Sequence, residues 1–115
     1  MKYNLIEDLS FKFSIRIIEL YRQLTQRKEY VLSKQLLRSG TSIGANIAES
    51  ISAESKQDFI HKLSIFLKEA RETMYWLRLI EQSGFASISI QPYLFDINRI
   101  ISILTAIIKR SKGNI

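Results

Sequence analysis

The chain has 115 residues, of which 46% are hydrophobic and 24% are charged, and it contains no cysteine. This length fits one soluble globular domain with a real core, and the lack of cysteine excludes disulfides, thiol nucleophiles and thiolate metal sites. The 17 basic and 11 acidic residues give a net charge of +6, which suits a nucleic-acid partner but is also common in small proteins that have none.

Four Gly residues and one Pro leave little material for turns, so long helices with short connections are expected. The spacing of apolar residues predicts helices over about residues 5–26, 30–52, 55–82 and 92–110. Asn4 is expected to be the N-cap of the first helix. The core stripe of this helix consists of apolar residues three and four positions apart: Ile6, Leu9, Phe13, Ile17, Leu20 and Leu24.

The second helix contains residues 38–50, where two glycines interrupt an otherwise helical pattern. A glycine inside a helix costs about 1 kcal/mol relative to alanine, so it needs a packing or functional reason. Small residues recur every four positions, at Gly40, Gly44, Ala48 and Ser52. This ladder predicts that a neighbouring helix packs closely against the second helix.

A polar row lies on another face of the second helix and consists of Arg38, Ser42, Asn46 and Glu49. At about 100° per residue, these side chains fall within roughly an 80° arc. Arg38 and Glu49 are about 16 Å apart along the axis, which is too far for a direct ion pair. We expect the row to form a hydrogen-bonded seam that fixes the register of a neighbouring helix, with a ligand or partner contact as the alternative.

Capping residues mark the ends of the third and fourth helices. Ser55 is expected to be the N-cap of the third helix, with Asp58 completing an approximate capping box. Gly84, directly after Ser83, predicts the end of this helix. A loop over residues 85–91 then leads to Pro92, which fits the first turn of the fourth helix.

These elements predict a single all-α domain over residues 1–115. Because the connections are short, the fold expected is an up-down-up-down antiparallel four-helix bundle. Residues 111–115 are expected to fray at the end of the fourth helix.

The first and third helices carry more apolar surface than a monomer needs. The surplus residues are Phe11, Ile15 and Ile18 on the first helix and Ile65, Trp76 and Ile80 on the third. Contiguous exposed apolar patches mark interaction sites, whereas scattered apolar residues need no explanation. Because the surplus residues form stripes, we predict that they are the interface of a homo-oligomer.

A second polar row lies on the third helix, within roughly a 100° arc: His61, Ser64, Lys68, Arg71, Tyr75 and Arg78. Cations with an interleaved aromatic residue hold phosphates and stack a base. The candidate nucleic-acid contacts are therefore Lys68, Arg71, Tyr75 and Arg78. The alternative is a solvated face whose charges pair with the nearby Glu69 and Glu72.

Patterns typical of catalysis or metal binding are absent from the sequence. His61 is the single histidine, and the Glu-x-x-His arrangement of di-iron bundles does not occur. Gly40 and Gly44 lie within a helix rather than in a phosphate-binding loop between a strand and a helix. We therefore predict no catalytic residue, no cofactor and no metal, and we expect that the chain is not an enzyme.

A targeting or membrane-spanning segment is not expected either. Glu7 and Asp8 interrupt the N-terminal region, where a signal peptide needs an apolar run. The longest uncharged apolar stretch, residues 100–108, is about half of the ~20 residues that a membrane span requires. We therefore expect a cytoplasmic protein with no membrane contact.

A specific motif occurs in the second helix, where Ser39 precedes a spaced Ser-Ile-x-x-Asn-Ile-Ala-Glu run from Ser42 to Glu49. The third helix adds Phe59, Leu63, Ala70, Glu72 and Leu77. Together these residues resemble the bacterial four-helix-bundle family known from intervening sequences of large-subunit ribosomal RNA genes. Ser50 stands where members usually have Gly, and Thr73 and Met74 depart from the small, acidic pattern common there.

The resemblance implies a ring-shaped homopentamer of bundles. It also implies kinship with the accessory variability determinant of diversity-generating retroelements, a basic pentamer that binds a reverse transcriptase and nucleic acid. The first functional hypothesis is a non-enzymatic, basic, homo-oligomeric assembly protein that binds RNA or DNA, a nucleic-acid enzyme such as a reverse transcriptase, or both. The alternative is a protein-binding scaffold that binds no nucleic acid.

Overall fold

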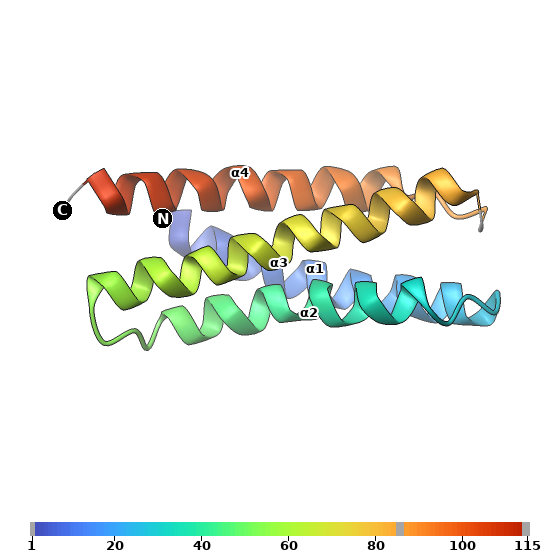
Figure 1. Cartoon of the computed structure of the whole chain (residues 1–115), viewed down its shortest axis with the longest axis horizontal. Coiled ribbons are helices and arrows are strands. Elements are labelled where there is room, and N and C mark those ends of the chain that lie inside the picture. The colour runs from blue at the N-terminus through green and yellow to red at the C-terminus, as the bar shows by residue number, and fades with distance from the viewer. Residues whose placement is uncertain (1, 85–86, 114–115) are drawn as a thin grey trace.

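A computed structural model describes residues 2–84 and 87–113 of the chain. These residues form four α-helices and no strands: α1 (Lys2–Gln26), α2 (Leu32–Ser50), α3 (Lys56–Ser83) and α4 (Gln91–Gly113). The molecule is elongated, with extents of 48 × 20 × 20 Å. Consecutive helices run in opposite directions, which confirms the prediction of an all-α, up-down-up-down four-helix bundle (Figure 1).

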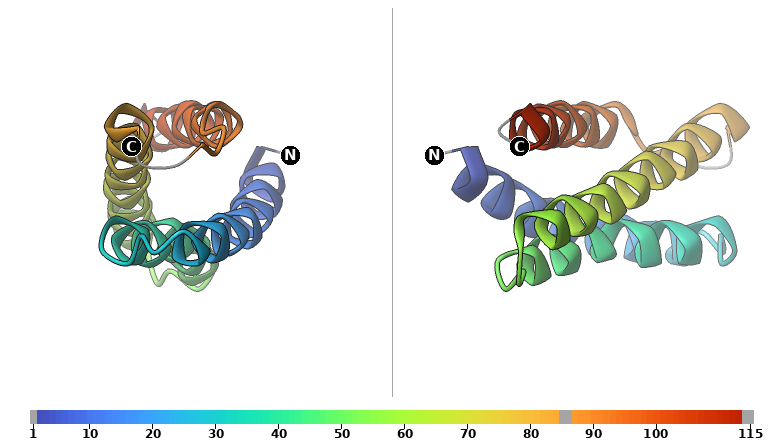
Figure 2. Two further views of the ribbon diagram at one scale, coloured as in Figure 1. Left: turned by 90° about the vertical axis from the view of Figure 1, so that its right-hand side faces the viewer. Right: turned by 60° about the vertical axis from the view of Figure 1, so that its left-hand side comes forward.

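The helices pack around the bundle in chain order, and α4 closes against α1. α1 and α3 are diagonal to each other and make no close backbone approach within the described residues. The end view in Figure 2 places α3 and the N-terminal part of α1 on opposite sides of the bundle. Surface features on α1 and α3 therefore face different directions.

The core between the four helices is built from one apolar stripe on each. Its buried members are Ile6, Phe13, Ile17, Leu20 and Leu24 from α1, Leu36, Ile43 and Ile47 from α2, Leu63, Phe66, Ala70, Leu77 and Ile80 from α3, and Ile97, Ile100, Leu104 and Ile108 from α4. The stripe predicted for α1 is confirmed, with Leu9 half-buried at the edge of the core. Each large buried side chain contributes about 1.5–3 kcal/mol, which makes this core the main stabilising feature of the bundle.

Two glycines of α2 lie where α1 approaches most closely. A methyl group added at Gly40 would lie 2.9 Å from Cγ2 of Ile17, and one added at Gly44 would lie 3.2 Å from Oγ of Ser14. The Ser14 hydroxyl also donates to the carbonyl of Gly40 at 3.4 Å. The predicted close packing is thus found at these two positions, whereas Ala48 and Ser52 are exposed and do not continue it.

The two ends of α3 have the predicted caps. The Ser55 hydroxyl accepts a hydrogen bond from the backbone N–H of Asp58 at 3.0 Å, and the Asp58 carboxylate accepts one from the N–H of Glu54 at 3.1 Å. Gly84 ends the helix in the left-handed region, at φ 63°. Pro92 lies in the first turn of α4, where its missing N–H removes no helical hydrogen bond.

The bounds of α1 and α2 differ from those predicted. α1 begins at Lys2, so Asn4 lies inside the helix and is not its N-cap. α2 ends at Ser50 rather than at residue 52, because the N–H of Ser52 donates to the carbonyl of Glu49 in a tight turn at 3.1 Å.

α4 is longer than predicted at its C-terminal end. Ser111–Gly113 are helical, and the Ser111 hydroxyl donates to the carbonyl of Ile107 one turn earlier at 2.8 Å. α4 also begins at Gln91, which was expected in the preceding loop. Residues 85–86 of that loop, and residues 114–115 of the expected frayed tail, lie outside the described residues.

The turn between α1 and α2 has two features that the residue pattern did not indicate. Lys28 adopts a left-handed conformation at φ 67°. The N–H of Lys28 donates to the carbonyl of Thr25 at 2.9 Å, and the N–H of Glu29 donates to that of Leu24 at 3.0 Å. This pair of bonds is the Schellman arrangement, which satisfies the last carbonyls of α1 and is usually formed around glycine.

A buried carboxylate caps the N-terminus of α2. Glu29 is 6% exposed, and its side chain accepts hydrogen bonds from the backbone N–H groups of Val31 and Leu32, both at 3.0 Å, and of Ser33. Burial raises the pKa of Glu29, but these donors outweigh burial and lower it below its ordinary value of 4.5. Because the carboxylate binds these N–H groups, α2 begins at Leu32 rather than at the predicted residue 30.

Gly40→Ala should destabilise the protein. Overpacking against the buried Ile17 costs about 1–3 kcal/mol, and the higher helix propensity of alanine returns about 1 kcal/mol. We expect a net loss of up to about 2 kcal/mol in the unfolding free energy from urea titration. Gly113→Ala is the matched control because nothing lies within 4 Å of its added methyl group. A Gly40→Ala protein stabilised by the full gain of about 1 kcal/mol expected from alanine would contradict the close approach.

Glu29→Gln should lower the unfolding free energy at neutral pH by about 1–2 kcal/mol, because the cap loses its charge and keeps one acceptor oxygen. The pKa of Glu29 is lowered in the folded state. Its contribution to stability is therefore complete above the unfolded-state pKa and is lost as the pH falls through the folded-state pKa. The difference between wild type and Glu29→Gln should shrink over this acidic range in urea titrations at a series of pH values.

Glu49→Gln is the control for this measurement. Glu49 is an exposed carboxylate of the same helix, and within the described residues its side chain forms no hydrogen bond or ion pair. Its substitution should change stability little at any pH. If the Glu29→Gln difference stayed constant while the pH fell, the carboxylate would not be the cap described above.

Candidate nucleic-acid interface

The α3 basic stripe consists of Lys68, Arg71, Tyr75 and Arg78, and all four side chains are exposed. Tyr75 retains 56% of its surface. The stripe extends over residues 68–78, a distance of about 15 Å along the helix. His61 and Ser64 extend the exposed face towards the start of α3, where the Ser64 hydroxyl donates to the carbonyl of Ile60 at 2.9 Å. The predicted row therefore lies on one solvent-facing side of α3.

The two glutamates beside the stripe bind α2. Arg38 forms ion pairs with Glu72 and, at 3.5 Å, with Glu69. The Ser42 hydroxyl donates to the Glu69 carboxylate at 3.2 Å. Within the described residues, Lys68, Arg71 and Arg78 take part in no ion pair.

This pairing distinguishes the two interpretations of the stripe. A solvated face neutralised by Glu69 and Glu72 requires these carboxylates to pair with the stripe itself. They face Arg38 instead, so the stripe keeps its positive charge. An exposed cluster of cations that forms no ion pair with the neighbouring carboxylates has a favourable field for a polyanion.

The aromatic residue of the stripe is held from behind by a chain of contacts. The Trp76 Nε1–H donates to the Glu72 carboxylate at 3.1 Å, and Glu72 is itself paired with Arg38. The rings of Tyr75 and Trp76 meet edge to face, with centroids 5.3 Å apart. The exposed Tyr75 ring is thus oriented by a neighbour that α2 fixes in place, which lowers the entropy lost when a base stacks on it.

The polar row of α2 divides into two parts. Arg38 and Ser42 bind α3 as a seam, whereas Asn46 is half-buried and Glu49 is exposed, and neither side chain forms a hydrogen bond within the described residues. A buried contact that the prediction missed lies beside the seam: the Thr73 hydroxyl donates to that of Ser39 at 2.9 Å. The sequence feature that could have indicated this contact is Ser39, which belongs to the family motif and directly follows Arg38.

The residues predicted to form an oligomer interface are not brought together in one chain. Phe11 and Ile15 are exposed and Ile18 is half-buried on α1, while Ile65 is exposed and Trp76 is half-buried on α3. The prediction for Ile80 is wrong. This side chain is 2% exposed and belongs to the monomer core, because α3 packs against both α2 and α4 and so buries a wide arc.

Other functional features are few in the part of the chain that the structure describes. A shallow hollow lies at one end of the stripe, lined by Tyr75, Arg78, Leu79 and Gln82. Among the described residues, no group of three or more His, Asp or Glu side chains is arranged to hold a metal ion. No helix there is both long and apolar enough to cross a membrane.

Comparison with known proteins places the chain in a family. The model of the 23S rRNA-intervening sequence protein family matches residues 3–106. A crystal structure of a protein of unknown function from the S23 ribosomal protein family of Bacteroides thetaiotaomicron is 48% identical, with a TM-score of 0.91, and the match covers 95% of this chain and 99% of that chain. No curated protein matches. The chain therefore belongs to the 23S rRNA-intervening sequence protein family.

Proposed function

We propose that this family member is a non-enzymatic assembly protein that binds nucleic acid through the α3 basic stripe. The observation that carries the proposal is the pairing of Glu69 and Glu72 with α2, which leaves the cations of the stripe without carboxylate partners in the described structure. RNA is the first ligand to test, because the family description refers to an intervening sequence of 23S rRNA.

The chemistry of the stripe suits a single-stranded polyanion. Lys68 and Arg71 offer charges to phosphates, and an aromatic platform such as Tyr75 stacks any base without sequence preference. A single stripe of three cations provides few phosphate contacts, so one chain should bind weakly. Repetition of the stripe in an oligomer raises avidity without adding a new kind of contact.

The placement of apolar residues supports assembly into a ring. A closed ring needs two different surface patches on each chain, one for each neighbour. Phe11 and Ile15 on α1 and Ile65 on α3 provide such patches on diagonal helices. We therefore propose a homo-oligomer in which the α1 patch of one chain meets the α3 side of the next, and the resemblance to pentameric bundle proteins favours a pentamer.

The apolar patches also favour a second candidate function, a protein-binding scaffold without nucleic-acid affinity. Phe11 is 67% exposed, which is unusual for a large aromatic side chain. In this case the positive charge contributes only to solubility. Direct measurement of RNA binding separates the two candidates.

The protein should bind a labelled single-stranded RNA at low salt, as measured by fluorescence anisotropy, and the affinity should fall steeply as salt increases. Lys68→Gln combined with Arg71→Gln should weaken binding and reduce the slope of log affinity against log salt by about 1.4, or about 0.7 for each phosphate that is no longer neutralised. Trp76 is the single tryptophan and adjoins the stripe, so its fluorescence provides a second readout.

Lys109→Gln combined with Arg110→Gln is the matched control for this experiment. It removes the same charge from exposed positions near the end of α4, outside the stripe. The control should leave the slope nearly unchanged. If wild type bound neither RNA nor DNA at low salt, the nucleic-acid proposal would be rejected in favour of the scaffold. If both double variants weakened binding equally, binding would depend on the net charge of the protein and not on the α3 basic stripe.

Sedimentation velocity at micromolar concentration should show wild type as an oligomer, and Phe11→Ser combined with Ile15→Ser should sediment as a smaller species. Both side chains are exposed, so their replacement removes apolar contact between chains without opening a cavity. Phe95→Ser is the control because Phe95 is 70% exposed on α4 and lies outside the predicted interface. A wild-type protein that sedimented strictly as a monomer would overturn this assignment.

A further inference from the structure

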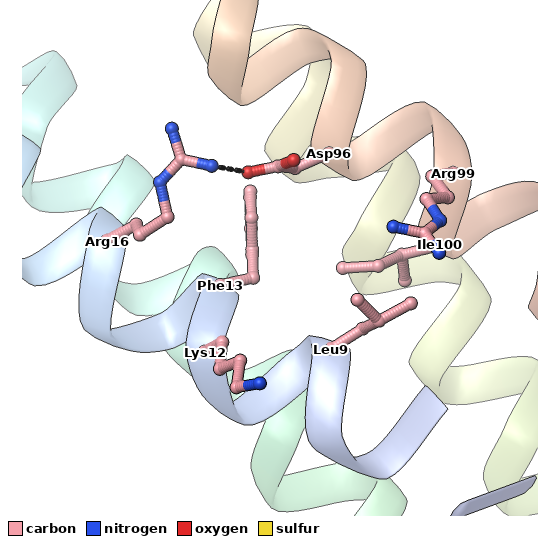
Figure 3. A pocket seen from close by; sticks show the side chains of 7 residues that line it. All are labelled: Leu9, Lys12, Phe13, Arg16, Asp96, Arg99 and Ile100. Atoms are coloured by element: carbon pink, nitrogen blue, oxygen red, sulfur yellow. Dashed lines mark hydrogen bonds and ion pairs between the residues drawn. The ribbon is translucent and has the colours of Figure 1, made fainter. Parts of the chain in front are cut away.

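A pocket of about 190 Å³ opens between α1 and α4 (Figure 3). From α1 it is lined by Leu9, Lys12, Phe13 and Arg16, and from α4 by Asp96, Arg99 and Ile100. The pocket belongs to the face that α1 and α4 share, and α3 makes no close approach to α1. It is therefore separate from the α3 basic stripe.

The floor of the α1–α4 pocket is apolar. Phe13 and Ile100 are almost fully buried, at 2% and 1% exposed, so the accessible apolar surface comes mainly from the half-buried Leu9 and from the aliphatic stems of the cationic side chains. An aromatic or branched apolar group placed on this floor would remove that surface from water, which is favourable by about 25 cal/mol for each Å² buried.

The rim of the pocket contains three cations and one carboxylate. Arg16 forms an ion pair with Asp96, and its guanidinium lies 4.9 Å from the centre of the Tyr93 ring. These contacts tie α1 to α4 and hold Arg16 in place. Asp96 is thus paired with Arg16 rather than with either of the other two cations of the rim.

Lys12 and Arg99 are the cations available for a ligand. Lys12 pairs with Asp8 at 2.9 Å, but both side chains are well exposed, and ion pairs of this kind are weak. Arg99 forms no ion pair with any described residue. One available cation therefore stands on each helix, on either side of the apolar floor.

We propose that the α1–α4 pocket binds a small organic anion with an apolar ring and one carboxylate or phosphate group. The ring lies on Leu9 and the aliphatic stems of the cationic side chains, over the edges of Phe13 and Ile100, and the anionic group lies between Lys12 and Arg99. The planar guanidinium of Arg99 offers the two parallel N–H donors that carboxylate and phosphate oxygens accept. The pocket is smaller than the roughly 300–1,000 Å³ of drug-sized ligand sites, so one ring is the size expected.

Three probes of similar shape test this site: benzoate, phenyl phosphate and benzylamine. Methyl NMR spectra of the full chain report binding through the signals of Leu9 and Ile100. Both anions, or one of them, should shift these signals, and the cationic benzylamine should not. Binding of benzoate alone assigns a carboxylate ligand, and binding of phenyl phosphate alone assigns a phosphate ester.

Arg99→Gln should weaken binding of the anion at least about tenfold, since a hydrogen bond to a charged group is worth about 1.5–3 kcal/mol. Lys109→Gln, an exposed change on the same helix outside the pocket, should leave affinity unchanged. Circular dichroism verifies folding, and Lys12→Gln replaces Arg99→Gln if that variant does not fold. The proposal is overturned if neither anion shifts the two methyl signals, if benzylamine shifts them equally, or if the folded pocket variant binds as wild type does.

Discussion

The orientation of α3 depends on its polar contacts with α2. Arg38 pairs with Glu69 and Glu72, which lie three residues apart on one side of α3, and the buried Thr73 hydroxyl donates to Ser39 beside them. A helix is rigid about its axis, so fixing one side fixes the direction of every other side chain. When the glutamates face α2, the cations of the stripe face solvent. The Arg38 ion pairs are partly exposed and each contributes little to stability. Together with the buried Thr73–Ser39 bond, they fit the rotation of α3 that also buries its apolar stripe.

Much of the fold follows from local patterns in the sequence. The spacing of apolar residues predicted four helices in the correct order. Ser55 marked the start of α3 because its hydroxyl accepts from a free N–H of the first turn, and Gly84 marked the end because it has no Cβ to oppose the left-handed conformation. The turn before α2 could not be predicted in the same way. Lysine has no preference for the left-handed conformation that Lys28 adopts, and a glutamate three residues before a helix start is not a usual cap. Tertiary packing of the chain around Glu29 determines both.

The sequence predicted which way the side chains of the site point around their own helix, but not which residues of neighbouring helices they contact. A helical wheel gives the angle of a side chain around its own axis, and this was sufficient to place Lys68, Arg71 and Arg78 on an exposed face. It does not give the position of the neighbouring helices. Ile80 was therefore assigned to the surface although α3 buries an arc against two neighbours. For the same reason the α2 row was expected to bind along its whole length, whereas Asn46 and Glu49 form no side-chain hydrogen bond to the described part of α3.

Five of the 11 acidic side chains of the protein are used in contacts that hold the helices rather than in pairs with the surface cations of the stripe. Glu29 caps α2, Asp58 accepts from the backbone before α3, and Asp96 ties α4 to Arg16. Together with the two glutamates of the α2–α3 seam, these groups serve helix ends and helix contacts. Cations such as Arg71 and Arg99 have no such structural partner within the described residues, so they determine the field outside the molecule. Six of the 17 basic residues lie on two separate surfaces, three in the α3 basic stripe and three at the α1–α4 pocket.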